Sequence, residues 1–170
     1  MDFLELAKAR YSVRKFTDEA VSQEEIGKIL EAAQAAPTAC NRQPQHIYVA
    51  VTPEARAAVA TATSCHFNAP VLMVIAYDRT ISWHREFDKA DYGTADVAIT
   101  VTQMMLQAAE LGLGSTYVAW FDPAKLSAAL QLPANMVPAA ILPVGHPAPD
   151  AEPAIMHTQR KPLSELATWL

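Results

Sequence analysis

A cluster of basic side chains lies near the start of the chain. Lys8, Arg10, Arg14 and Lys15 fall close together, and Ser12 lies between the two arginines. Side chains alternate in direction along an extended backbone, so Arg10, Ser12 and Arg14 would point to the same side. Two guanidinium groups with a hydroxyl between them suit a phosphate dianion. The alternative is an ordinary solvated surface whose charges pair with nearby acids.

A second basic pair, Arg160 and Lys161, follows an acidic and proline-rich stretch near the other end of the chain. By itself this pair is uninformative. It gains meaning if the fold returns it to the first cluster, because a phosphate needs about two or three cationic partners.

A polar loop bounded by prolines spans residues 36–45. Asn41 and Gln43 carry amide groups whose paired donors and acceptors match the edge of a planar heterocycle. Loops of this composition are more often ordinary turns, which is the alternative here. The sequence contains no G-x-G-x-x-G and no G-x-x-x-x-G-K-[ST], so a Rossmann or P-loop nucleotide site is unsupported.

Other residues with chemical potential lack a supporting pattern. The five histidines form no H-x-x-x-H pair and no Cys/His spacing typical of zinc, so we expect no metal site. Cys40 could be a nucleophile, but no local signature surrounds it. Trp120, beside Phe121 and just before a helix cap, is the tryptophan that we expect to face a pocket.

The composition indicates one folded domain, residues 1–170, that also carries a subunit interface. Chains of this length usually form a single domain. Apolar residues make up 51% of the chain and charged residues only 18%, below the roughly 25% of an average globular protein. This deficit hints at more buried surface than a lone domain offers. The net charge of -5 argues against a nucleic-acid partner.

The cysteine content and the hydropathy bear on the compartment. Cys40 and Cys65 form no disulfide framework, so we expect a reducing, cytoplasmic location. The start of the sequence does not resemble a signal peptide. The longest apolar stretch, residues 69–77, has 9 residues, too few to span a bilayer, so we expect no membrane partner.

Hydrophobic periodicity and end signals predict an α+β chain with helices flanking a central sheet. We expect helices over residues 2–10, 22–36 and 91–111, helices that begin after Thr52 and Asp122, and a short helix over 163–170. Strands are predicted over 47–51, 71–76, 115–120 and 139–144. The tail from residue 148 onward is predicted to be an extended arm. A fifth strand could come from this tail, including that of a partner subunit.

Six segments, in the same order, resemble motifs of the FMN-dependent nitroreductases. They are residues 10–16 (RYSVRKF), 37–44 (PTACNRQP), 91–95 (DYGTA), 111–116 (LGLGST), 143–147 (PVGHP) and 160–163 (RKPL). Each motif alone is weak, but together they cover nearly the whole chain. The chain is similar to the shorter members of that family, which lack large excursions between elements.

The resemblance implies an interlocked α+β homodimer with a mostly antiparallel sheet and FMN in two clefts at the subunit interface. The matched positions then imply three groups of contacts. The FMN phosphate would be held by Arg10, Ser12, Arg14 and Arg160, with Lys161 beside them. The flavin would be contacted from the partner subunit by Pro37, Thr38, Ala39 and Asn41, and Gln43 matches a further motif position. Flavin N5 would be approached by the backbone amides of Ala119 and Trp120.

Two positions depart from the family pattern. Gln45 stands where the family often has an aromatic residue, which could alter the packing under the cofactor. Trp120 stands where many members have a small residue, and its side chain could narrow the acceptor pocket.

The resemblance implies an NAD(P)H-dependent flavin oxidoreductase. It would reduce nitroaromatics, quinones or similar electron-poor acceptors by ping-pong hydride transfer, with FMN bound and NAD(P)H as transient donor. The chain offers no obvious catalytic acid, and Arg42 is the candidate for stabilising reduced flavin near N1. A flavin-dependent dehalogenase or dehydrogenase of the same fold, and a non-catalytic flavin-binding sensor or carrier, are the alternatives.

Overall fold

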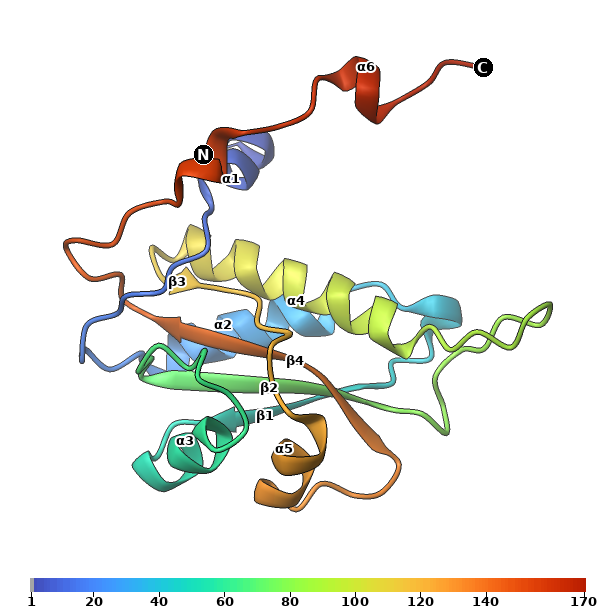
Figure 1. Cartoon of the computed structure of the whole chain (residues 1–170), viewed down its shortest axis with the longest axis horizontal. Coiled ribbons are helices and arrows are strands. Elements are labelled where there is room, and N and C mark those ends of the chain that lie inside the picture. The colour runs from blue at the N-terminus through green and yellow to red at the C-terminus, as the bar shows by residue number, and fades with distance from the viewer. Residues whose placement is uncertain (1) are drawn as a thin grey trace.

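The computed structural model describes residues 2–170, which form a four-stranded antiparallel sheet covered by helices on both faces (Figure 1). The strands lie in the order β1-β2-β4-β3. Their bounds are Gln45–Ala50 for β1, Val71–Asp78 for β2, Gly114–Ser115 for β3 and Met136–Gly145 for β4. The register pairs Ile47 with Ile75 and Met73 with Leu142, and it shifts opposite Ile75 and Ala76, where Ala139 of β4 is the extra residue. The predicted α+β class and antiparallel sheet are confirmed.

Two hydrophobic cores lie on the two faces of the sheet, because successive residues of β2 point to opposite sides. On one face, α2 (Gln23–Gln34) and α4 (Gly93–Glu110) pack over Met73 and Ile75. On the other face, α3 (Pro53–Ala60) and α5 (Pro123–Ala129) pack over Leu72 and Val74 (Figure 1). Every residue of β2 except its last is therefore buried, which explains its continuous apolar sequence.

The predicted helix starts are confirmed by their caps. Ser22 and Glu25 form the capping box of α2, and the side chains of Thr52 and Asp122 cap α3 and α5. A similar box, Asp2 with Glu5, begins α1 (Phe3–Ala9).

The chain between β3 and α5 differs from the prediction. A strand over residues 115–120 is wrong, because β3 ends at Ser115 and only Val118 makes a further bridge, to Ile141. The backbone is instead drawn toward the end of α3. There the Thr63 hydroxyl donates to the Trp120 carbonyl, and the Asp122 N–H donates to the Ala62 carbonyl over 2.9 Å.

The segment after β4 leaves the sheet and runs past α1 as an arm (Figure 1). It carries two short helical turns, η2 (Ile155–Thr158) and α6 (Leu163–Leu166). The helix expected over residues 163–170 is thus only one turn long, because nothing in the described chain covers its apolar side chains, and short helices need such packing. Within residues 2–170, no helix is both long and apolar enough to cross a bilayer.

The N-terminal segment after α1 is extended and lies along the short strand β3. Ser12 forms a parallel bridge with Ser115, whose carbonyl accepts a 3.0 Å hydrogen bond from the Val13 N–H. Val13 is buried and packs so closely on Gly114 that a Cβ there would meet the Val13 side chain at 2.8 Å. Because Val13 points inward, its neighbours Ser12 and Arg14 point away from the core.

Candidate functional site

Two arginines from opposite ends of the chain lie within electrostatic range of each other. Burial, and secondly the positive charge of Arg160, lower the pKa of Arg10. The Nη1 atom of Arg10 is enclosed and has no hydrogen-bond partner in the described chain. The arm therefore brings Arg160 back to the N-terminal basic cluster. This is the condition under which the two clusters could share one anion.

The other cations of this region differ in how they are engaged. Arg14 donates from Nη1 to the Ser12 carbonyl over 3.2 Å, and Arg160 donates to the Gln159 carbonyl over 2.8 Å. Lys161 is exposed. Among residues 2–170, no carboxylate lies within 4.0 Å of Arg10, Arg14 or Arg160 in an ion pair. Three guanidinium groups thus have no ion-pair partner in the described part of the chain.

Lys15, by contrast, is not available to a ligand. Its Nζ atom forms a 2.6 Å ion pair with Asp150, which raises the pKa of Lys15 and lowers that of Asp150. Ser12 and Arg14 line a cavity of about 240 Å³ together with these two residues. Glu152 lines the same cavity, so the charges of its two basic and two acidic side chains balance.

The polar loop after α2 is held in a strained shape. Its centre is the short turn η1 (Ala39–Asn41), and three non-glycine residues have left-handed backbone angles: Cys40 and Asn41 at φ 51° and Gln43 at φ 48°. This conformation costs Cys40 and Gln43 roughly 1–2 kcal/mol each, whereas asparagine tolerates it better. The Thr38 hydroxyl accepts from the Gln43 N–H over 3.0 Å, and the Ala39 N–H donates to a carboxylate oxygen of Asp96 over 2.9 Å.

This strained loop presents its amide groups outward. Asn41 and Gln43 are exposed, and Gln43 donates to the Asn41 carbonyl over 3.3 Å. Pro37 is exposed as well, and Thr38 is half-buried. Within the described chain, no hydrogen bond or ion pair joins this loop to the arginine cluster. The structure thus does not bring these two sets of predicted site residues together in one chain.

A cavity of about 560 Å³ lies between the end of α3 and the start of α5. Its walls are residues 60–64, His66 and residues 119–122. Trp120 borders it with 78% of its surface exposed. Among the described residues, no hydrogen bond uses the backbone N–H of Ala119 or Trp120. Two free amide donors therefore lie at the wall of a cavity large enough for a cofactor ring.

Thr63 is a site residue that the sequence did not reveal. Its hydroxyl donates to the Trp120 carbonyl and accepts from the Cys65 N–H over 3.0 Å. These two bonds hold the residue 119–121 turn against the end of α3. The only local signal is a hydroxyl residue within an alanine-rich run, which is too common to single out.

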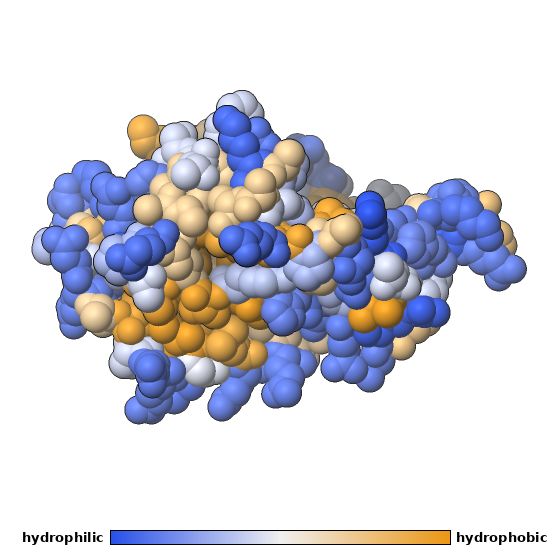
Figure 2. All heavy atoms as spheres, turned by 90° about the horizontal axis from the view of Figure 1, so that it is seen from below, coloured by the Kyte–Doolittle hydropathy of each residue, from blue (hydrophilic) through white to orange (hydrophobic). Residues whose placement is uncertain are grey.

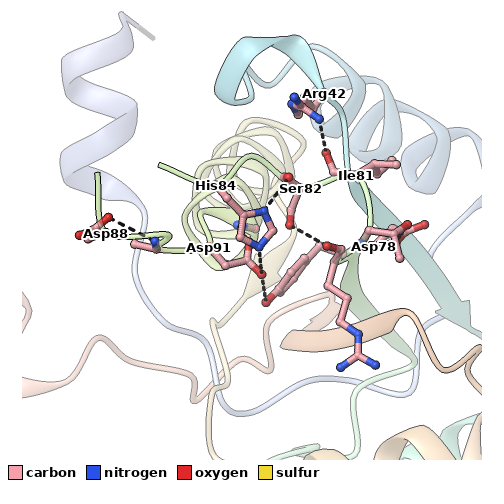
Figure 3. A network of polar contacts seen from close by, with 12 residues as sticks. Arg42, Asp78, Ile81, Ser82, His84, Asp88 and Asp91 are labelled. Carbon is pink, nitrogen blue, oxygen red and sulfur yellow. Dashed lines mark hydrogen bonds and ion pairs between the residues drawn. The ribbon is translucent and has the colours of Figure 1, made fainter. Parts of the chain in front are cut away.

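A polar network joins the end of β2 to the start of α4 (Figure 3). Asp91 accepts from the Tyr77 hydroxyl over 3.1 Å and from the Gly93 N–H over 2.9 Å, and the His84 ring lies 3.9 Å away. Burial alone would raise the pKa of Asp91, but hydrogen bonds from the Gly93 N–H and from the side chains of Ser82 and Tyr77 outweigh it and lower that pKa. Arg42 donates to the Ile81 carbonyl over 3.5 Å, so it lies beside this network.

A model of the nitroreductase family matches residues 7–67 and 64–146. The chain belongs to the nitroreductase family. A nitroreductase family protein from Clostridium difficile 630 is 37% identical, with a TM-score of 0.93 and coverage of 99% of this chain and 98% of that one. The sequence-based assignment to this family is confirmed.

Two further relatives carry more specific names. A protein from Desulfovibrio desulfuricans, described as a nitroreductase in complex with FMN, is 31% identical, with a TM-score of 0.82 and coverage of 98% of this chain and 95% of that one. A protein from Methanothermobacter thermautotrophicus, named for NADH dehydrogenase and NAD(P)H nitroreductase activity, is 28% identical over 155 residues, 87% of this chain and 78% of its own length. These matches thus extend over most of the length of the relatives as well as of this chain.

Proposed function

We propose that this nitroreductase-family protein is an FMN-dependent NAD(P)H oxidoreductase that reduces electron-poor aromatic acceptors. The observation that carries the proposal is the pairing of Arg10 with Arg160, two guanidinium groups that repel each other with no carboxylate between them. Such an arrangement is unfavourable unless a dianion joins it, and the enclosed Nη1 atom of Arg10 lacks a partner. A relative is solved with FMN, whose phosphate is such a dianion.

Three regions of the protein would each contact a different part of the cofactor. Arg10, Ser12, Arg14 and Arg160 would hold the phosphate, with Lys161 beside them. The ring would lie at the 560 Å³ cavity, where Ala119 and Trp120 offer free N–H donors. The loop residues Pro37, Thr38, Ala39, Asn41 and Gln43 would contact the flavin of the partner subunit, which agrees with their separation from the arginines in one chain.

The bound FMN would supply the redox chemistry by taking a hydride from NAD(P)H and delivering it to the acceptor. The chain itself positions the reactants and supplies hydrogen bonds. The amides of Ala119 and Trp120 are available as fixed donors at the cavity wall. His66, which also lines the cavity, accepts from the Asn68 N–H at Nδ1 over 3.1 Å, so its proton is held at Nε2.

The acceptor class follows from the residue at the cavity mouth. The indole of Trp120 is largely exposed there, and its backbone is fixed by Thr63. Planar aromatic rings stack favourably on such a surface. Nitroaromatics and quinones, which are planar and electron-poor, are the acceptors that this mouth would favour.

A homodimer is part of the same proposal. The accessible surface of the chain is 10288 Å², whereas a folded monomer of 18.5 kDa exposes about 8200 Å². Part of the excess lies on the arm, where Leu163, Leu166 and Trp169 are exposed. The opposite face, which carries α3 and α5, also shows apolar side chains (Figure 2), but the proposed contact is the one at the arm. Contact with a second copy would cover the arm.

The test combines cofactor binding with anaerobic half-reactions. The purified protein is saturated with FMN and mixed with NADH or NADPH in the absence of oxygen, and the loss of flavin absorbance is followed. We expect rapid reduction by at least one nucleotide, then reoxidation by nitroaromatics and quinones. Failure to bind FMN would remove the cofactor from the proposal. Binding without reduction by either nucleotide would identify a flavin carrier instead of an oxidoreductase.

A further inference from the structure

Asp96 is a buried carboxylate in the first turn of α4, and the proposed reaction does not use it. Only 2% of its surface is exposed. Its neighbours along the helix, Val97 and Val101, belong to the core on the face of the sheet that α2 and α4 cover. Burial of a polar group costs free energy unless hydrogen bonds compensate it, so a carboxylate at this place requires an explanation.

The hydrogen bonds of Asp96 point to one backbone group. Its Oδ1 atom accepts from the Ala39 N–H over 2.9 Å, while its Oδ2 atom is enclosed and has no partner in the described chain. The nearby Thr100 hydroxyl donates to the backbone carbonyl of Asp96 and not to its side chain. The position in the first turn of α4 is electrostatically favourable, because N–H groups at a helix start carry partial positive charge.

The group that Asp96 holds is the strained loop described above. Most hydrogen bonds of residues 38–43 stay within the loop, such as Thr38 with Gln43 and Gln43 with Asn41. Arg42 reaches Ile81 only at 3.5 Å. The 2.9 Å bond from Ala39 to Asp96 is therefore the strongest polar link between this loop and the buried helix.

We propose that Asp96 is a positioning residue, which fixes the loop in the left-handed conformation that presents residues 37–41 to the FMN bound mainly by the partner subunit. This inference rests on the proposed function, because it assigns the loop to the cofactor. Asp96 does not touch the flavin. It acts through the Ala39 amide. Its unpartnered Oδ2 atom lowers the stability of the fold, and we assign this cost to the function of holding the loop.

Three substitutions and one control separate positioning from general stability. Asp96→Ala removes the acceptor. Asp96→Asn keeps a carbonyl oxygen at the same place. Ala39→Pro removes the donor and leaves α4 intact, and it suits the site because proline is favoured at a first helical position and Thr38 before it is extended. The control, Thr100→Val, alters a fully buried hydroxyl one turn further along α4, which donates to the Asp96 backbone carbonyl and not to the loop.

Two readouts are needed. The first is FMN affinity, from the quenching of flavin fluorescence. The second is the hydrogen-exchange rate of the Ala39 amide in the FMN-free protein, which reports on the bond without the cofactor. We expect Asp96→Ala and Ala39→Pro each to weaken FMN binding about tenfold or more, and the double variant to add little. We expect Asp96→Asn and Thr100→Val to stay within about threefold of the parent protein.

The outcomes distinguish this inference from the proposed function. If the parent protein does not bind FMN, the proposed function fails, while the exchange rate of Ala39 in the Asp96→Ala variant still decides whether Asp96 holds the loop. If FMN binds and the folded Asp96→Ala and Ala39→Pro variants bind it as tightly as the parent, the positioning role is refuted. Unchanged exchange of the Ala39 amide in Asp96→Ala would refute it as well. Should Asp96→Ala fail to fold, the affinity comparison passes to Ala39→Pro, judged against Ala39→Gly, which changes the same flavin-contacting residue but keeps its N–H. Equal FMN affinity of these two variants would refute the positioning role.

Discussion

In the described chain, four buried side-chain polar atoms lack a hydrogen-bond partner, on Arg10, Gln45, Arg56 and Asp96. The Nη1 atom of Arg10 and the Oδ2 atom of Asp96 are both enclosed without a partner in the described chain. Arg10 also lies near the like charge of Arg160. Such atoms reduce stability, so an unpartnered atom on Arg10, a residue that the sequence assigned to the phosphate site, favours binding over structure as the reason for this side chain.

Replacing Arg10 should separate binding from stability. Arg10→Met removes charge-assisted hydrogen bonds to the phosphate, worth about 1.5–3 kcal/mol, so the Kd for FMN should rise about 10- to 100-fold. The FMN-free variant should melt no lower than the parent, because repulsion from Arg160 is relieved. Lys15→Met is the matched control, since Lys15 is already paired with Asp150. Equal losses of FMN affinity in the two variants would contradict a specific role for Arg10.

Trp120 should set acceptor preference without holding the cofactor by its side chain. Trp120→Ala leaves the backbone N–H in place, so FMN affinity should change by less than about threefold. The KM for nitroaromatics and quinones should rise about 2- to 10-fold, because stacking is worth roughly 0.5–1.5 kcal/mol. Steady-state kinetics with several acceptors check this. A uniform loss of FMN binding in the variant would show that the indole packs on the cofactor instead.

At the scale of elements, the start of α4 depends on close packing of its first residue, Gly93, against β2. Gly93 lies against the ring of Tyr77, which a Cβ at position 93 would overlap. Tyr77 in turn donates to Asp91, which accepts from the Gly93 N–H. The first turn of α4, which also carries Asp96, is thereby fixed on β2.

A pair of glycine substitutions tests this contact. Gly93→Ala should lower the free energy of unfolding by about 1–3 kcal/mol, because a methyl group does not fit beside Tyr77. Gly27→Ala, in the middle of α2 with nothing within 4 Å of its Cβ, should raise it by about 0.5–1 kcal/mol. Urea unfolding of both variants gives the comparison. Similar effects at the two sites would show that the Tyr77 contact is unimportant.

The same network predicts part of the pH dependence of stability. Hydrogen bonds lower the pKa of Asp91 in the folded protein below its ordinary value of about 3.9, so the ionised form stabilises the fold above that value. This contribution is lost as the pH falls through the folded pKa. Asp91→Asn should keep the Gly93 bond but remove this part of the acid-induced loss. Unfolding free energies measured between about pH 3 and pH 6 test it, and parallel curves for the two proteins would contradict the assignment.

At the scale of the whole molecule, the arm is the part that one chain leaves unsupported. Trp169 at its end is 97% exposed, and the arm runs beyond α1 away from the sheet (Figure 1). An interlocked dimer, which stays a prediction, would give these side chains a surface to cover. It would also bring the loop of one subunit to the arginine cluster of the other.

Removing the apolar side chains of the arm tests this arrangement. The triple change Leu163→Ser, Leu166→Ser and Trp169→Ser should weaken dimerisation at least about a hundredfold, because each large side chain contributes roughly 1.5–3 kcal/mol when buried. Lys125→Ser on α5, on the opposite side of the sheet, is the control. Analytical ultracentrifugation over a dilution series measures both. A parent protein that sediments as a monomer would refute the dimer.

The sequence by itself determined the family, the enzyme class expected of it and most of the elements. Capping boxes, Thr-Pro and Asp-Pro starts and the apolar run of β2 are local signals, so helices and strands could be predicted from short windows. The family resemblance assigned Arg10, Ser12, Arg14 and Arg160 to one phosphate site, which stays a prediction. The strand predicted over residues 115–120 was wrong because a distant side chain, Thr63, redirects the backbone at Trp120.

Only the tertiary structure decided which buried polar groups meet. The bond between Ala39 and Asp96 and the bond between Thr63 and Trp120 each join residues 57 positions apart. Local sequence patterns report caps and amphipathic faces, because those depend on neighbours within a few residues. The partner of a buried carboxylate or hydroxyl depends instead on how helices and strands pack, and α4 against the residue 37–43 loop is a contact that no local pattern encodes.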